Sequence, residues 1–168
     1  MKRIVCISLL LISVGSCFAS ETEHQEIKSV INAYDQSIQA KDKSRFLTIF
    51  ADPSLPMIAV YSKEVMKWRR ALVKKINKEK NKKLVATKTF TLTPTEGIDI
   101  SVSEKLSTRK ALSSIKIVSD GNIANVYFDY VYYIDDKKNN WGSESWQVMQ
   151  TLTGWKISSV IYSIAGSI

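Results

Sequence analysis

The feature that most constrains the fold is a run of consecutive strand patterns towards the end of the chain. The patterns cover Ile123–Ile134, Gly142–Leu152 and Trp155–Ile164, and a further strand is indicated around Ala111–Val118. Val, Ile, Tyr, Trp and Thr are abundant in these segments, and such residues fit a pleated, half-buried surface. Turn signals separate the patterns at Asp120-Gly121, at Thr153-Gly154 and at 136–140. We therefore expect a meander of antiparallel strands.

Helical spacing dominates the first part of the chain. Glu21–Ala40 predicts a long helix with one apolar stripe, formed by Ile27, Val30, Ile31, Tyr34 and Ile38. Asp42 is placed to cap a short helix over Lys43–Phe50, whose residues Phe46, Leu47 and Phe50 we expect to turn inward. Pro53 and Pro56 end that helix.

The middle of the chain predicts one more helix between short strands. Met57–Tyr61 reads as a strand, Glu64–Asn81 as a helix and Leu84–Thr93 as a weak strand, while 94–97 reads as a turn. Within the helix, the stripe expected to pack inward consists of Val65, Trp68, Leu72 and Ile76. Helices followed by antiparallel strands favour an α+β fold. A curved antiparallel sheet wrapped around the N-terminal helix, with two further helices, would bury that helix's single stripe.

The positive charge is concentrated in this middle helix. The whole chain carries a formal net charge of +8. Without residues 1–19, which we interpret below as a signal peptide that includes Lys2 and Arg3, the net charge is +6. Lys63–Lys83 holds ten Lys and Arg residues against Glu64 and Glu79, a local net charge of +8, so the rest of the chain from residue 20 onwards carries −2. The basicity therefore belongs to one element rather than to the domain.

Four segments resemble the nuclear transport factor 2-like superfamily, which includes SnoaL-like cyclases, ketosteroid isomerase, scytalone dehydratase and many small exported proteins. The segments are Tyr34–Asp42, Phe50–Asp52, Gly142–Val148 and Thr153–Ser163. The resemblance implies a cone-shaped fold with a pocket between helices and sheet, often dimeric through the outer sheet face. It also implies a carboxylate base on the strand after the second helix, where isomerase-like members place one. The corresponding strand, Met57–Ser62, contains no Asp or Glu.

The remaining candidates for a site are carboxylates and aromatic residues. Candidate catalytic residues are Asp129, Glu144 and Tyr34, and candidate pocket residues are Tyr34, Tyr61, Trp68, Tyr127, Asp129 and Trp146. Strand alternation puts Tyr127 and Asp129 on one face, and Phe128 and Tyr130 on the other, without indicating which face lines the cone. A carboxylate such as Asp129 could orient or deprotonate a ligand, or could simply pair with a neighbouring Lys or hydroxyl on an open sheet face. The other interpretation of the aromatic residues, which we favour, is that they fill the core.

Other chemistry has weaker support. The single histidine, His24, lies at the start of the first helix and is expected to be solvated. No Gly-rich phosphate loop, metal-ligand spacing or nucleophile elbow is present, so we expect no cofactor and no metal.

The basic helix has two interpretations. It is either a solvated face or a surface that contacts anionic lipid or an acidic partner, for which the candidate residues are Lys67, Arg70, Lys74 and Lys78. Nucleic acid is not an expected partner of this helix, because the first residues of the chain predict export, as described next.

The first residues predict export. Met1-Lys2-Arg3 is a basic start, and Ile4–Val14 is an apolar run that is too short to span a bilayer. Residues 1–19 are therefore expected to be a signal peptide and 20–168 a single nuclear transport factor 2-like domain. An alternative is a lipobox at 14–17 with a lipidated Cys17. In either case the mature domain contains no cysteine thiol for disulfides or catalysis.

Taken together, these patterns favour an exported, periplasmic or secreted module for small-molecule binding or interaction without catalysis, for which a small hydrophobic molecule is the candidate ligand. Two alternatives stay open. One is a SnoaL-type isomerase, cyclase or lyase acting on a small hydrophobic substrate. The other is a cell-envelope interaction protein that works through helix 64–81.

Mass spectrometry of the exported protein tests the first of these expectations. The mature chain should begin at Ser20, because Cys17 and Ala19 supply the small residues required at positions −3 and −1 of the cleavage site. A mass that corresponds to a lipidated N-terminal Cys17 would show that the alternative is right.

Overall fold

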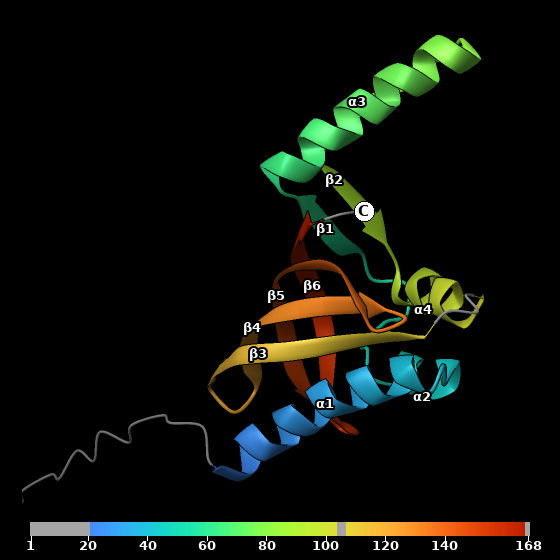
Figure 1. The fold of residues 1–168 in the computed structure, drawn as a ribbon. Coiled ribbons are helices and arrows are strands. Elements are labelled where there is room, and N and C mark those ends of the chain that lie inside the picture. The colour runs from blue at the N-terminus through green and yellow to red at the C-terminus, as the bar shows by residue number, and fades with distance from the viewer. Residues whose placement is uncertain (1–20, 104–106, 167–168) are drawn as a thin grey trace, which may run out of the picture.

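The predicted meander forms four consecutive strands of one sheet. A computed structural model describes residues 21–103 and 107–166, and its strands are listed in chain order as β1 (Met57–Tyr61), β2 (Thr89–Leu92), β3 (Thr108–Ser119), β4 (Ile123–Ile134), β5 (Lys137–Thr151) and β6 (Gly154–Gly166). They form one curved sheet in the order β2-β1-β6-β5-β4-β3, with α1 (Glu21–Gln39) packed across its inner face (Figure 1). Neighbouring strands are antiparallel except β1 and β6, which are parallel. The predicted α+β class and curved sheet are confirmed.

The turn between β4 and β5 is shorter than predicted. The five-residue turn expected at 136–140 is wrong, because β5 already begins at Lys137, which pairs with Ile134. Asp135 and Asp136 alone make the turn, with φ of 46° and 59°. Two successive positive φ values define the tight turn whose twist matches that of paired strands, and Asp tolerates this conformation better than most residues.

The first two helices cover the inner face of the sheet. In α1, the stripe residues Ile27, Ile31 and Tyr34 are buried. The second helix, α2 (Lys43–Leu47), is shorter than predicted but begins where expected, since a carboxylate oxygen of Asp42 accepts from the Arg45 amide at 2.9 Å.

The basic helix α3 (Lys63–Lys80) stands away from the rest of the molecule (Figure 1). Its first turn is anchored, because Val65 and Met66 are buried. Beyond that turn the prediction of an inward-packed stripe is wrong: Trp68 is 47% exposed and Leu72 is 38% exposed. The helical period correctly placed these residues on one face, but of that face only Val65 is buried, while Ile76 is half-buried and Trp68 and Leu72 are exposed.

A fourth helix, α4 (Pro94–Ser103), replaces the turn predicted at 94–97. A reciprocal cap starts the helix: the Thr93 hydroxyl accepts from the Glu96 amide at 3.1 Å, and the Glu96 carboxylate accepts from the Thr93 amide at 2.7 Å. Pro94 suits the first helical position, where its missing N–H is not needed. The apolar residue Ile98 is then buried against the core.

No helix among residues 21–103 and 107–166 is long and apolar enough to cross a membrane. The predicted signal peptide and lipobox, with Cys6 and Cys17, lie outside the described residues.

Replacing Trp155 with Ala should lower the free energy of unfolding by about 3–5 kcal/mol, the range for truncating a buried large aromatic residue. Trp155 is 5% exposed and packs in the main core where β6 enters the sheet. Denaturant unfolding measures the change. The control is Trp141→Ala, because Trp141 is 41% exposed and the Lys138 ammonium lies over its ring, 4.0 Å from the ring centre. That control should cost about 1 kcal/mol or less. Equal midpoints for wild type and Trp155→Ala would contradict this assignment.

Candidate functional site

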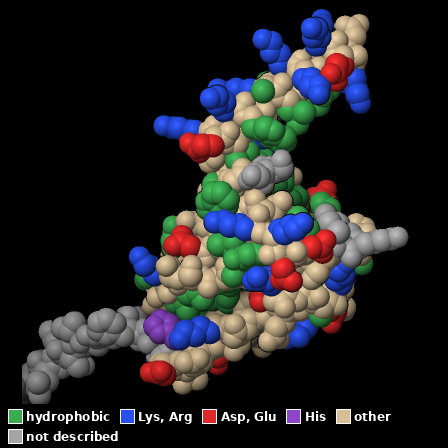
Figure 2. All heavy atoms as spheres, in the orientation of Figure 1, with side chains coloured by type: hydrophobic (Ala, Val, Ile, Leu, Met, Phe, Trp, Pro, Cys, Tyr) green, Lys and Arg blue, Asp and Glu red, His purple; other side chains and the backbone are tan. Residues whose placement is uncertain are grey.

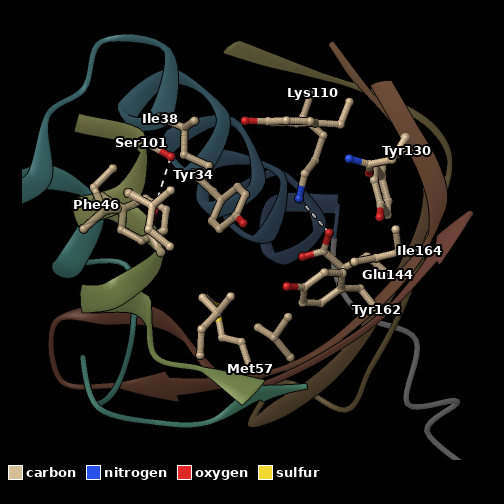
Figure 3. Close-up of a pocket in the computed structure, with 17 residues that line it drawn as sticks. Tyr34, Ile38, Phe46, Met57, Ser101, Lys110, Tyr130, Glu144, Tyr162 and Ile164 are labelled. Atoms are coloured by element: carbon tan, nitrogen blue, oxygen red, sulfur yellow. Dashed lines mark hydrogen bonds and ion pairs between the residues drawn. The ribbon is translucent and has the colours of Figure 1, made fainter. Parts of the chain in front are cut away.

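A cavity of about 240 Å³ lies between the inner face of the sheet and the helices α1, α2 and α4 (Figure 3). All six strands contribute side chains to it. The lining residues are Tyr34, Ile38, Phe46, Met57, Leu92, Gly97, Ile98, Ile100, Ser101, Lys110, Tyr130, Tyr132, Asn140, Glu144, Val160, Tyr162 and Ile164. Most of these are apolar or aromatic, so the few charged groups among them determine the chemistry of the cavity.

Strand alternation brings the polar groups to the inner face. On β4, the residues in phase with buried Phe128 are Tyr130 and Tyr132, and on β5 Glu144 is in phase with buried Trp146. Figure 3 shows that Tyr34, Lys110, Glu144 and Tyr162 converge from α1, β3, β5 and β6 on the middle of the cavity.

A buried ion pair forms the centre of the site. The Lys110 ammonium donates to one oxygen of Glu144 at 2.7 Å, and the Trp146 indole N–H donates to the other oxygen at 2.7 Å. The Glu144 side chain is 1% exposed and the Lys110 side chain 13%. The Lys110 ammonium also lies 5.1 Å from the ring centre of Tyr34 and 4.9 Å from that of Tyr130. Both charges are therefore compensated inside the protein, as burial requires.

Burial and charge set the protonation states. Burial raises the pKa of Tyr34 to about 12, and it also raises the pKa values of Tyr130 and Tyr162 above the usual value for tyrosine. Burial alone would lower the pKa of Lys110, but the Glu144 carboxylate together with Tyr34 and Tyr130 favours the charged form, so the pKa lies above its ordinary value. At neutral pH the site therefore contains protonated tyrosine hydroxyls and a permanent ammonium group.

The described part of the chain holds no group of three or more His, Cys, Asp and Glu residues placed to bind a metal ion. The cavity instead combines hydrogen-bond donors with apolar walls. Such a site can hold a polar group of a small molecule through its donors and the rest of that molecule through hydrophobic contact.

No protein-family model matches the sequence, and no curated protein sequence is significantly similar to it. Solved structures do match the fold. A cystatin-like-fold protein of unknown function from Nostoc punctiforme is 11% identical, with a TM-score of 0.59 over 89% of this chain and 96% of that one. A nuclear transport factor 2-like protein of unknown function from Shewanella baltica is 14% identical, with a TM-score of 0.57 over 89% of this chain and 99% of that one. The chain has the nuclear transport factor 2-like fold.

A third match concerns a protein with a proposed activity. It comes from Novosphingobium aromaticivorans, has been proposed to be a scytalone dehydratase and is 14% identical, with a TM-score of 0.58 over 86% of this chain and 85% of that one. At such identities the likeness concerns the fold alone. The resemblance noted in the sequence is confirmed at that level.

Two of the predicted site residues lie in the cavity of this nuclear transport factor 2-like fold. Tyr34 and Glu144 line it, and Trp146 lies directly behind it, fully buried and bonded to Glu144.

Asp129 and Tyr127 lie on the opposite, outer face of the sheet, so their placement in a pocket is wrong. Tyr127 is 42% exposed, and Asp129 accepts a hydrogen bond from the Ser143 hydroxyl at 2.7 Å. The reason is the phase of β4, which turns Phe128 and Tyr130 inward.

The other predicted pocket residues lie near α3. Tyr61 packs with Phe90 in a second small core and has the Arg69 guanidinium 4.2 Å from its ring centre, while Trp68 is exposed on α3. His24 lies in the first turn of α1 and does not line the cavity.

Sequence reasoning missed Lys110 and Tyr162. Lys110 lies near the start of β3, just before the strand that was predicted around Ala111–Val118, and its phase with Leu112 places it on the inner face. Tyr162 belongs to a strand that was predicted, and its phase with the apolar residues Val160 and Ile164, both buried in the structure, places it on the inner face.

Replacing Lys110 with Met should lower the free energy of unfolding by about 3–5 kcal/mol, because it leaves a buried carboxylate without its counter-ion. The double variant Lys110→Met/Glu144→Gln should be more stable than Lys110→Met, since no uncompensated charge then remains. The control is Lys116→Met, on the exposed part of the same strand, which should change stability by about 0.5 kcal/mol or less. Denaturant unfolding measures all three variants, and equal effects at Lys110 and Lys116 would contradict the pairing.

Proposed function

We propose that this protein binds a small, mainly apolar molecule that carries one neutral carbonyl group, and that it does so without catalysis. The observation that carries the proposal is the buried Lys110–Glu144 pair in a cavity that is otherwise apolar and aromatic. The volume of about 240 Å³ lies below the roughly 300–1,000 Å³ of pockets for drug-sized ligands, which supports a small ligand.

The charge of the site favours a neutral acceptor. The Lys110 and Glu144 charges cancel, so an incoming carboxylate would meet the carboxylate of Glu144 without an unmatched cation. An ammonium group would meet the ammonium of Lys110 and tyrosine hydroxyls that act as donors. A carbonyl oxygen avoids both repulsions, and it can accept from hydroxyls such as that of Tyr162, which points into the cavity (Figure 3).

The same contacts argue against catalysis. Both oxygens of Glu144 already accept hydrogen bonds, so the carboxylate is poorly placed to take a proton from a ligand. The raised pKa of Lys110 keeps its amine protonated, which removes the lone pair that a nucleophile needs.

A SnoaL-type isomerase, cyclase or lyase is the second candidate. The observation in its favour is the convergence of Tyr34 and Lys110, two donors that could stabilise an oxyanion next to Glu144.

We place this binding function in the cell envelope. The support is the basic and apolar start of the chain, which has the pattern of a secretory signal.

Three octyl compounds of similar length test the ligand chemistry: 2-octanone, octanoate and octylamine. Isothermal titration calorimetry should show that 2-octanone binds at least about tenfold more tightly than the other two, a difference of roughly 1.4 kcal/mol. Octylamine binding as tightly as the ketone would overturn the proposed acceptor chemistry. Conversion of the ketone to a product during the titration would favour the enzymatic candidate.

Matched tyrosine variants test whether the binding occurs in the cavity. Tyr162→Phe removes a cavity hydroxyl and should weaken 2-octanone binding by about fivefold, the value of one ordinary hydrogen bond. The control Tyr127→Phe makes the same change on the outer face and should leave binding unchanged. Equal effects of both variants would show that the ketone binds elsewhere.

A further inference from the structure

The basic helix and the chain segment that returns from it form an arm outside the main body. We define this basic arm as α3 with residues 81–88, and Figures 1 and 2 show α3 extending away from the sheet. Its root is fixed, because the Ser62 hydroxyl caps α3 through the Val65 amide and the Arg69 guanidinium lies over the Tyr61 ring. The arm is therefore held in a defined direction at its base.

The returning segment covers only one side of α3. The Asn77 side chain brackets Leu84, donating to its carbonyl at 2.9 Å and accepting from its amide at 2.8 Å. Val73 is half-buried on α3, whereas Trp68 and Leu72 are 47% and 38% exposed. An aromatic and an aliphatic side chain, one helical turn apart, thus form an uncovered apolar face.

The opposite face of α3 is basic. Lys67, Arg70, Lys74 and Lys78 follow one another at spacings of three and four residues, which places them together, and all are exposed. Figure 2 shows Lys and Arg side chains spread along the arm, with few acidic ones between them. Within α3, Lys75 and Glu79 form an ion pair at 3.9 Å. This pair involves none of the four basic residues named above, so it neutralises little of the positive charge on that face.

We propose that the basic arm binds anionic lipid bilayers, with Trp68 and Leu72 in the interface and the basic side chains attracted by the lipid phosphates. A helix with one apolar face that contains Trp and Leu, a face rich in Lys and Arg, and low overall hydrophobicity lies in the plane of a membrane surface. Charge complementarity selects this occupant over a second copy of the chain. Pairing two arms would bring together two elements that each carry +8 over Lys63–Lys83.

Vesicle co-sedimentation tests the electrostatic part. The wild type should bind vesicles of mixed phosphatidylglycerol and phosphatidylcholine, should not bind pure phosphatidylcholine, and should be released as salt shortens the screening length. The arm variant changes Lys67, Arg70, Lys74 and Lys78 to Gln. Each basic side chain near an anionic leaflet strengthens binding by about fivefold, so the variant should bind at least about tenfold more weakly.

A charge-matched variant is the control. It changes Lys28, Lys116, Lys137 and Lys138 to Gln, four exposed lysines outside the arm. Its binding should stay within about threefold of wild type, because distant charges are screened beyond about 8 Å. All variants are made in the same full chain, so any contribution of residues 1–20 is common to them. Equal losses in the two variants, or equal binding to neutral and anionic vesicles, would overturn the proposal.

Trp68 reports on insertion. Anionic vesicles should shift the tryptophan emission of the wild type to shorter wavelength, and Trp68→Phe should abolish most of that shift while the protein still sediments with the vesicles. Trp141→Phe, which changes another exposed tryptophan, should retain the shift. If the arm instead docks a second copy, sedimentation velocity without lipid will show a dimer that Trp68→Ser/Leu72→Ser dissociates, and that result would replace the membrane with a partner chain.

Discussion

The indole of Trp146 connects the hydrophobic core to the polar site, and much of the structure depends on it. Its ring lies 4.9 Å from that of Tyr34 on α1 and 5.0 Å from that of Phe128 on β4, so it joins the helix to the inner face of the sheet. Its N–H donates to Glu144, which in turn holds Lys110. A single buried side chain therefore supports both the packing of α1 in the curved sheet and the position of the carboxylate in the cavity.

The ion pair limits what the cavity can accept. A lone carboxylate at 1% exposure would be costly, and a lone ammonium would bind anions without discrimination. Together, Lys110 and Glu144 leave a site that is neutral overall but strongly polar at one point, with aromatic rings around the ammonium. For the ligand that we propose, selectivity would arise from the direction of hydrogen bonding rather than from net charge. This property suits ligand recognition more readily than proton transfer.

Patterns that recur along the chain were predictable, whereas contacts between distant segments were not. The period of β4 and the cap at Asp42 follow from neighbouring residues, and both are found in the structure. The capping pair Thr93 and Glu96 was equally local, but Pro94 between them and Gly97 directly after them suggested a turn. The inward face of β4 and the partner of Glu144 depend on how α1 and β3 pack, which no local pattern contains. Spacing likewise placed the stripe of α3 on one face but could not indicate that the body ends after its first turn.

The cavity and the basic arm are separate in space but joined through the sheet. The arm is inserted between β1 and β2, and these strands pair directly, with Met57 opposite Leu92. Both residues also line the cavity. The strand pair that closes one wall of the cavity therefore also fixes the root of the arm, and the positive charge stays on the arm, away from the neutral Lys110–Glu144 pair. A protein built in this way can place a charged helix on a surface while the cavity around the neutral ion pair remains electrostatically undisturbed, because charge–charge interactions are screened over about 8 Å at physiological salt.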